Sequence, residues 1–451
     1  MTDLAIGMHA IGALIALIYL IWRVGPHFSL TMIFLTALLL IHGPAYLAYV
    51  WWYGPDTFVY EKVLPPNNRD EVIFTLTSAL AACFIGIILG AELAMRFWPN
   101  SAGWLTRTFR DEARLAPRVV ASSDTVFMLT GVILIAVMAG VSLMENHIGK
   151  IIDFVTAPGS ELDKAAIRRE IGGSGLYAYN LLLNAVAPFI GIATYLGASH
   201  RQGRRLLGIA LPLIAVIALG KLATLSKAPF ALFLVQLILA TSMVRSLRVN
   251  TLTVAGLTIS MSALLVMVSL VAIPELDIIS AGKYLFYRTL MIPNEVLVEY
   301  FATIPDVIPH GWGARFPLLS SLLPAPNDGI QMYTAVAEVS RGSTDSTSNA
   351  MFLGDAWAEF GWFGALLFPI IAGFVVRSVD IYAFRNGKTE VGIAIVSSAT
   401  LGVFTLLSTS LTTALLSGGL MLVPLVAWMT SMSGSMIGKD ATRHDLREPL
   451  R

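Results

Sequence analysis

Charged side chains are scarce in this chain. They make up 13% of its 451 residues, whereas soluble domains carry about 25%. The two signs nearly cancel, with 30 Lys and Arg against 29 Asp and Glu, so the chain has neither the basic excess of a nucleic-acid binder nor an acidic tail. These numbers argue against a soluble fold and against nucleic acid as a partner.

Cysteine is almost absent, and the familiar metal and nucleotide motifs are missing. Cys83, in an apolar run, is the only cysteine, which excludes a disulfide framework, a thiolate zinc site and a CxxC redox pair. No HExxH or DxD spacing occurs, and no P-loop or GxGxxG lies in a soluble context. We therefore expect no metal site and no cofactor.

Long hydrophobic runs are what the chain has in abundance. Hydrophobic residues make up 56% of it, and its mean hydropathy is +0.73. A helix needs about 20 apolar residues to cross a bilayer, and the runs are too continuous for the alternating strands of a barrel. We predict an all-α polytopic membrane protein with about eleven transmembrane helices, at 4–22, 28–50, 72–95, 124–144, 176–198, 206–221, 227–244, 251–273, 356–376, 390–410 and 411–430.

The distribution of basic residues predicts the orientation. With the N-terminus exported and the C-terminus cytoplasmic, 18 of the 30 basic residues face the cytoplasm. The clusters at 201–205 and 245–248 then lie in short cytoplasmic loops, where this rule is most informative. No signal peptide is evident, because Met1-Thr2-Asp3 lacks a basic region and Arg23 follows the first apolar run.

This topology divides the chain into four parts. Residues 1–273 hold eight helices, 274–355 form a long exported stretch, 356–430 hold three helices, and 431–451 form a cytoplasmic tail. The exported stretch is rich in aromatic residues and in prolines, and long ordered loops are usually functional, so we expect it to fold as an extracytoplasmic cap. Within it, 294–303 has helical spacing and 340–349 (SRGSTDSTSN) is typical of a mobile polar loop. We find no internal repeat.

Two carboxylates and a histidine are candidates for catalysis. Asp355 and Glu359 are spaced i, i+4, so they lie on one face of a helix that enters the membrane from the exported side. Carboxylates near hydrocarbon are costly, and one of them could accept a proton from a sugar hydroxyl. The alternative is that both complement the positive end of a helix dipole. His310, in a loop, could act as a base or contact a substrate, although a lone loop histidine more often does neither.

Five basic residues are candidates for binding an anion. Lys221 and Lys227 flank a turn whose side chains should reach the exported interface, where they could meet a phosphate or simply snorkel from the helix ends. Arg288 lies among aromatic and aliphatic neighbours and could bind phosphate oxygens or pair with Glu295 or Glu299. Arg315 is a further candidate, and Arg169 lies in a predicted interfacial helix whose charges could equally face water or headgroups.

The order of these landmarks resembles the oligosaccharide repeat-unit polymerases, the Wzy-type enzymes of bacterial surface polysaccharide assembly. The resemblance covers approximately 175–380. It includes 180–190 (NLLLNAVAPFI), the turn Ser226-Lys227-Ala228-Pro229, Arg288 in FYRTLMIPNE, the stretch Leu322-Leu323-Pro324 and the segment 349–364. The family often has arginine where this chain has Lys227, so a bidentate contact to diphosphate would be lost there.

The resemblance implies a GT-C-like membrane glycosyltransferase on the exported face of the bacterial inner membrane. Such an enzyme transfers a growing glycan from undecaprenyl diphosphate to a newly flipped lipid-linked repeat, without nucleotide sugar or metal. Its expected partners are the lipid-linked oligosaccharide, membrane lipid, a chain-length regulator and a flippase. The residues that would contact the departing diphosphate are Arg288, Lys227, Lys221, Arg169 and Arg315, and those that would orient or deprotonate the acceptor hydroxyl are Asp355, Glu359 and His310.

Two other interpretations stay open. An O-antigen ligase-like enzyme would use the same donor with a different acceptor, and sequence separates it poorly from a polymerase. A flippase or a solute transporter would place charged residues at mid-membrane on discontinuous helices. In this sequence most charges lie at the two predicted interfaces instead.

Overall fold

The structure is a computed structural model, and it is almost entirely helical. It describes residues 2–64, 68–110, 122–156, 177–201, 204–224, 227–250, short pieces between 255 and 270, 277–314, 331–342 and 347–432. Helices account for 84% of the structure, and the described residues contain no strand. The all-α prediction is confirmed.

Eight described helices are long and apolar enough to cross a membrane, and each coincides with a predicted span. The predicted span 251–273 falls mostly outside the described residues, and 390–410 and 411–430 correspond to shorter apolar helices, Glu390–Leu406 and Leu422–Met432. The architecture is therefore that of a multi-pass membrane protein. The eight spans are Asp3–Val24, Leu30–Asp56, Arg69–Phe97, Thr125–Met144, Tyr177–Ala198, Leu206–Ala223, Ala228–Arg245 and Phe352–Phe384.

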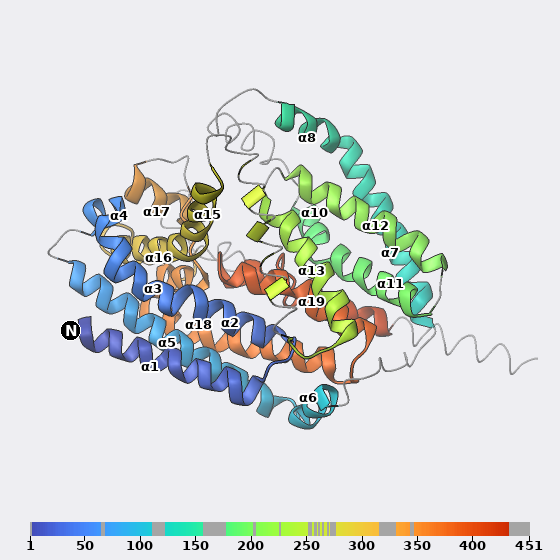
Figure 1. The fold of residues 1–451 in the computed structure, drawn as a ribbon, viewed down its shortest axis with the longest axis horizontal. Coiled ribbons are helices and arrows are strands. Elements are labelled where there is room, and N and C mark those ends of the chain that lie inside the picture. Colours follow the sequence, from blue (N-terminus) through green and yellow to red (C-terminus); the bar gives the residue numbers. More distant parts are fainter. Residues whose placement is uncertain are drawn as a thin grey trace, which may run out of the picture. The chain divides into compact units, whose positions relative to one another are not determined.

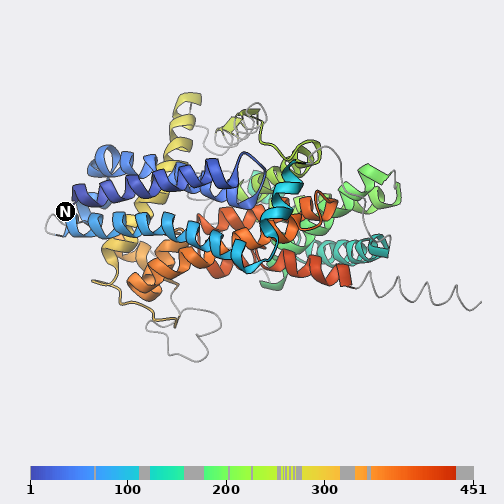
Figure 2. The same cartoon turned by 90° about the horizontal axis from the view of Figure 1, so that it is seen from below.

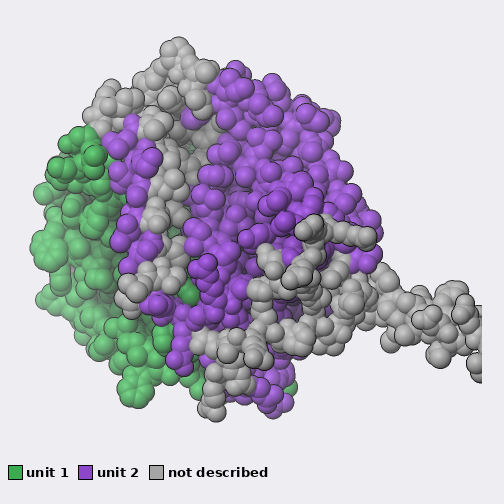
Figure 3. All heavy atoms as spheres, turned by 45° about the vertical axis from the view of Figure 1, so that its right-hand side comes forward, with its two compact units in different colours: residues 1–99, 275–378, 403–414 green, residues 100–274, 379–402, 415–451 purple. Residues whose placement is uncertain are grey.

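The chain folds into two compact units, each assembled from separated segments (Figure 3). Unit 1 comprises 1–99, 275–378 and 403–414, and unit 2 comprises 100–274, 379–402 and 415–451. The helices α18 (Phe352–Phe384) and α19 (Glu390–Leu406) each contribute to both units.

Unit 1 contains the predicted carboxylates. Its first helices are α1 (Thr2–Tyr19), α2 (Leu30–His42) and α5 (Arg69–Phe97), and α1 lies along α5 in both ribbon views (Figures 1 and 2). Shorter pieces complete it: η1 (Leu20–Val24), α3 (Pro44–Ala48), η2 (Tyr49–Tyr53), η3 (Gly54–Asp56), α4 (Phe58–Lys62), α15 (Ile278–Phe286), η5 (Tyr287–Met291), α16 (Ile292–Thr303), α17 (Met332–Arg341) and α20 (Leu411–Leu415).

Small residues let α5 and α18 approach backbone to backbone. A Cβ added at Gly90 would lie 2.0 Å from the Ile370 carbonyl oxygen, and one added at Gly373 would lie 2.1 Å from the Ile87 carbonyl oxygen. Gly86 and Gly90 form a GxxxG spacing, a pattern that favours close helix packing in membranes. This contact holds the part of α18 around residues 370–373 against α5.

A buried amide fixes α16 against α2. The Asn294 side chain donates to the backbone oxygens of Ile41 (2.8 Å) and Leu290 (2.7 Å), and its Oδ1 lies 2.8 Å from His42 Nδ1. Asn294 and His42 are both fully buried. Because buried polar groups are costly unless they are hydrogen-bonded, this arrangement specifies how α16 is positioned.

Unit 2 is built around α7 (Ser122–Met144), α11 (Ala187–Arg201) and α12 (Arg204–Ala223), which pack on one another. The π-helical segment η4 (Leu182–Val186) joins α10 (Tyr177–Leu181) to α11. Further helices are α6 (Ser101–Arg110), α8 (His147–Thr156) and α13 (Lys227–Arg245).

Candidate functional site

Helix α18 is interrupted at Gly361, two residues after Glu359. Gly361 has φ 55° and ψ −136°, which is not helical, so α18 consists of two helices joined at a kink. The carbonyl oxygens of Ala358 and Glu359 accept hydrogen bonds from the backbone N–H groups of Gly311 (3.0 Å) and Trp312 (2.7 Å). A loop from another part of unit 1 therefore caps the first half of α18.

The same loop holds the Glu359 side chain. Glu359 is buried, and its Oε2 accepts a hydrogen bond from the Gly313 N–H at 3.0 Å. Trp312 adopts φ 47°, a left-handed conformation that costs an aromatic residue about 1–2 kcal/mol. Such strain persists only where the surroundings impose it, and it is often found at functional sites.

Asp355 lies one turn before Glu359 on α18 and is half-buried. Its Oδ1 accepts from the Tyr300 hydroxyl at 3.5 Å, which is a long hydrogen bond. Among the described residues, Asp355 makes no ion pair. A half-buried carboxylate held by one weak contact is available to accept a proton from a bound hydroxyl.

His310 lies within a cluster of aromatic rings next to this break. Its ring centroid is 6.0 Å from Trp312 and 5.6 Å from Trp357, and Trp357 in turn stacks on Phe301 at 4.5 Å. His310 Nδ1 is buried and has no hydrogen-bond partner. A Cβ added to Gly361 would lie 3.2 Å from His310 Nε2, so the histidine packs directly against the helix break. The cluster combines apolar ring faces with polar groups that can bind hydroxyls.

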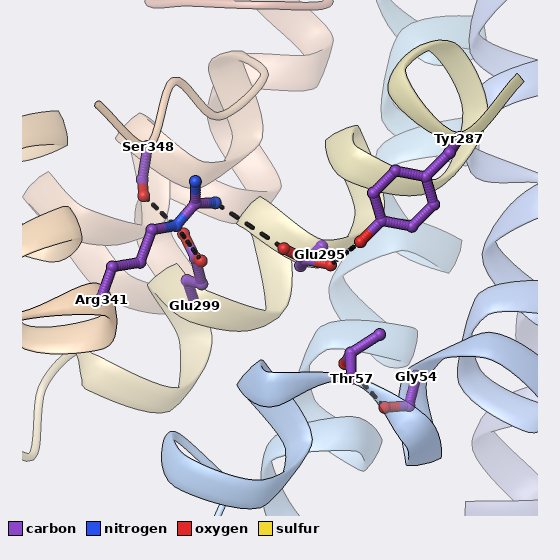
Figure 4. A network of polar contacts seen from close by, with 7 residues as sticks. All are labelled: Gly54, Thr57, Tyr287, Glu295, Glu299, Arg341 and Ser348. Atoms are coloured by element: carbon purple, nitrogen blue, oxygen red, sulfur yellow. Dashed lines mark hydrogen bonds and ion pairs between the residues drawn. The ribbon is translucent and has the colours of Figure 1, made fainter. Parts of the chain in front are cut away.

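A second pair of carboxylates, on α16, is engaged in ion pairs (Figure 4). Arg341 Nε donates to Glu299 Oε1 at 2.8 Å, and Arg341 Nη2 lies 3.8 Å from Glu295 Oε1. Ser348 donates to Glu299 Oε2 at 2.5 Å, and the Tyr287 hydroxyl donates to Glu295 Oε2 at 2.7 Å. Figure 4 shows the guanidinium group between the two carboxylates. The network joins α16, α17 and the residues just before α18.

Burial controls the ionisation of this network. Desolvation raises the pKa of Glu295 above its ordinary value, although the hydrogen bond from Tyr287 acts in the opposite direction. The nearby charge of Glu299 adds to the increase, and Arg341 opposes it. Desolvation and the bond to Glu295 also raise the pKa of Tyr287. At neutral pH Tyr287 therefore remains a hydrogen-bond donor to Glu295.

Of the five predicted basic residues, the structure describes the side chains of two, Arg288 in unit 1 and Lys221 in unit 2. Arg288 is exposed, not embedded as its apolar neighbours suggested, and its Nη1 donates to the Tyr284 hydroxyl at 2.7 Å. The ion pairs anticipated between Arg288 and Glu295 or Glu299 are made by Arg341 instead. Arg169, Arg315 and the Lys227 side chain lie outside the described residues.

The side chain of Lys221 also differs from the expectation that it reaches the exported interface. It does not extend to an interface, because its side chain is fully buried in unit 2 and donates to Asn184 Oδ1 at 2.9 Å. Lys221 lies in the last turn of α12, and this helix packs on α7 and α11. Whether Lys221 or Lys227 contacts a diphosphate stays a prediction.

Arg341 is the residue that sequence reasoning missed. The stretch 340–349 was expected to be a mobile polar loop, but Ser340 and Arg341 end helix α17, and Ser348 is fully buried. The sequence did contain a signal for this helix end, because a glycine follows Arg341 and glycine is common just after a helix. Gly342 adopts the left-handed conformation typical of a helix C-cap. A helix that ends at Arg341 places its side chain at a defined position.

The described residues contain no group of three or more His, Cys, Asp or Glu side chains that could hold a metal ion. Comparison of the chain with protein-family models, with curated proteins and with solved structures gave no match.

Proposed function

We propose that this chain is a membrane glycosyltransferase that polymerises lipid-linked oligosaccharide repeat units on the exported face of the bacterial inner membrane. One observation carries the proposal: Asp355, half-buried and without an ion pair among the described residues, shares a helix face with Glu359 beside the aromatic cluster of His310, Trp312 and Trp357. The ring faces would pack on the sugar, and the carboxylates would accept its hydroxyl hydrogens.

In the proposed reaction, the acceptor hydroxyl oxygen attacks the anomeric carbon of the donor glycan. The bond from that carbon to the diphosphate oxygen breaks, and undecaprenyl diphosphate leaves with the bonding electrons. Asp355 takes the hydroxyl proton, while Glu359 is held by the Gly313 amide and positions the 311–313 loop. The exposed Arg288 guanidinium would neutralise the charge that develops on the diphosphate.

The finer topology belongs to the same proposal. It includes eleven spans, an exported N-terminus, a cytoplasmic C-terminus, a GT-C-like arrangement and a cap formed by 274–355. The helical elements α15, η5, α16 and α17 within that stretch are consistent with a folded cap. The lipid-linked oligosaccharide, a chain-length regulator and a flippase are the proposed partners.

The test is a deletion strain in which the lipid-linked glycans are measured after complementation. We expect single repeats on the carrier in the deletion strain and long polymer with the wild type. Asp355→Asn should reduce polymer by about 10²–10⁴-fold, the range that a general base contributes, and Arg288→Ala should abolish it. Asp306→Asn and Lys283→Ala, which change exposed residues of the same unit, are the matched controls.

Two outcomes would contradict the proposal. Long polymer that remains on its lipid carrier in the deletion strain would indicate a ligase. Wild-type chain lengths in Asp355→Asn, with normal protein in the membrane, would remove Asp355 from the reaction.

One observation favours a transporter as the second candidate. Discontinuous helices commonly form substrate sites in transporters, and α18 is interrupted at Gly361 close to Glu359 and His310. A flippase deletion would leave single repeats on the cytoplasmic face, whereas a polymerase deletion would leave them on the exported face. Accessibility of those repeats to an added glycosidase separates the two functions.

A further inference from the structure

Helix α8 of unit 2 follows the membrane span Thr125–Met144 after a two-residue turn and carries exposed apolar side chains. Ile148 is 56% exposed and Ile152 is 55% exposed, and the two lie one turn apart on one face of α8. Leu143 and Met144, at the end of the span, are also exposed. Exposed apolar side chains that gather in this way mark a surface that contacts lipid or another protein.

The span before α8 carries an exposed apolar stripe of its own. Leu129, Ile133 and Val137 repeat every fourth residue along α7, so they lie on one face, and all three are exposed. Because α7 is long and apolar enough to cross a membrane, this face lies against lipid acyl chains. The exposed apolar residues of α8 therefore continue a surface that already contacts lipid.

A single asparagine separates the two helices. Asn146 adopts φ 49°, a left-handed conformation that asparagine tolerates better than most residues, and α7 ends before it. Its side-chain oxygen accepts a hydrogen bond from the Gly149 N–H at 3.3 Å, as the N-cap of a helix does. α8 is therefore a separate helix, and its direction does not have to follow that of α7.

The start of α8 lies level with the ends of two other spans of unit 2. The His147 ring lies 5.9 Å from the ring of Tyr179, which belongs to the first turn of the span Tyr177–Ala198. A Cβ added to Gly220, in the last turn of the span Leu206–Ala223, would lie 2.7 Å from the Tyr179 hydroxyl oxygen. These contacts place the first residue of α8 at a membrane boundary.

The hydrocarbon core has no room for α8 as an extension of α7. The span Thr125–Met144 has 20 residues, so it is about 30 Å long and crosses the core by itself. Lys150 and the exposed Asp153 also keep α8 out of the core, because charged groups there are costly. Ile148 and Ile152 can reach the acyl chains only if α8 lies along the interface, with its charged residues toward the headgroups.

We propose that α8 is an interfacial helix that inserts Ile148 and Ile152 among lipid acyl chains beside the end of α7. Its partner is the lipid surface, and the attraction comes from apolar area and not from charge. The Lys150 ammonium group is paired with Glu145 at 3.1 Å, so α8 offers anionic headgroups no excess positive charge. This surface belongs to unit 2, and it does not depend on the proposed reaction.

Spin labelling of the full chain tests the proposal, because Cys83 is the only cysteine and is fully buried, so the wild type is the labelling blank. A nitroxide is attached to Ile148→Cys in phosphatidylcholine nanodiscs. Its collision rate with O₂, which concentrates among acyl chains, is divided by that with water-soluble Ni-EDDA. We expect this ratio to be several-fold higher than at Asp153→Cys, an exposed position about 140° away around α8.

Two further positions make the measurement independent of a folding defect in one variant. Ile133→Cys, on the exposed stripe of α7, should give a high ratio in any correctly inserted protein. Ile152→Cys should repeat the result of Ile148→Cys one turn further along α8. Phosphatidylglycerol nanodiscs should leave these ratios unchanged, because the charge of Lys150 is compensated within the protein.

Three results would overturn the proposal. A ratio at Ile148→Cys as low as that at Asp153→Cys would place this face of α8 in water. Low collision rates with both reagents would show that protein, such as a second copy of the chain, covers it. A high ratio in phosphatidylglycerol alone would show that charge, and not apolar area, holds α8 at the membrane.

Discussion

Unit 1 contains two pairs of carboxylates with the same i, i+4 spacing but different surroundings. Glu295 and Glu299 on α16 share Arg341 and also accept hydrogen bonds from Tyr287 and Ser348. On α18, Asp355 accepts a long hydrogen bond from the Tyr300 hydroxyl, and Glu359 accepts one from the Gly313 amide. The i, i+4 spacing alone therefore does not distinguish a pair of carboxylates that stabilises the fold from a pair that could take part in a reaction.

The two pairs of carboxylates differ in their structural surroundings. The first pair joins α16, α17 and the residues just before α18 through a charge-assisted network, so it stabilises the fold. The second pair is next to a helix break, a residue with positive φ and a histidine with a buried unpartnered nitrogen, so its neighbourhood stores strain. We expect substitutions in the first pair to change stability and those in the second to change activity.

Removing Arg341 should have the largest effect on stability. In Arg341→Met, the fully buried Glu299 would lose its cation, and breaking a buried ion pair in this way costs about 3–5 kcal/mol. We expect a marked fall in the thermal unfolding temperature in detergent. Arg341→Met combined with Glu299→Gln should recover part of the loss, because the unpaired charge is removed.

Arg288→Met is the matched control for this prediction. Arg288 is exposed, so the change should alter the free energy of unfolding by no more than about 0.5 kcal/mol. If the two arginine variants were equally stable, Arg341 would not hold the network together.

Gly361→Ala should have an intermediate effect, near the second pair. Alanine at φ 55° is strained, and its Cβ would lie 3.2 Å from His310 Nε2, so we expect a loss of about 1–3 kcal/mol. The matched control is Gly7→Ala in α1, where an added Cβ has open space and alanine favours the helix by about 0.5–1 kcal/mol. A Gly361→Ala protein as stable as Gly7→Ala would show that α18 is not broken at this residue.

Much of the fold could be predicted from the sequence, because apolar runs of membrane length have few alternatives to a helix. Eight of the predicted spans coincide with eight described helices. The break in α18 could not be predicted in this way, since Gly361 lies in the apolar stretch EFGWFG, where hydropathy carries no information about φ. Nor does hydropathy show that Gly90 and Gly373 mark the contact between α5 and α18.

The candidate site was only partly predictable. The spacing of Asp355 and Glu359 predicts a shared helix face. The pairing of Arg341 with Glu299, however, joins residues 42 apart in the sequence, and the residues around either one do not indicate its partner. Lys221 shows the same limit. A lysine near the end of an apolar run resembles a snorkelling residue, and only the fold shows that its side chain is fully buried and bonded to Asn184. Long-range contacts decide which charges are structural.

The smallest effect that we predict is a dependence of stability on pH within the first pair. Because burial raises the pKa of Glu295 in the folded state, its contribution to stability is fully present below the ordinary carboxyl pKa. That contribution is lost as the pH rises from the ordinary value through the raised one. Glu295→Gln keeps an acceptor for Tyr287 and removes the titration, so its unfolding temperature should decline less over this pH range than that of the wild type. If the unfolding temperatures of the two proteins declined in parallel with pH, Arg341 would compensate the charges of both carboxylates fully. The first pair would then behave as an ordinary salt bridge and carry no strain.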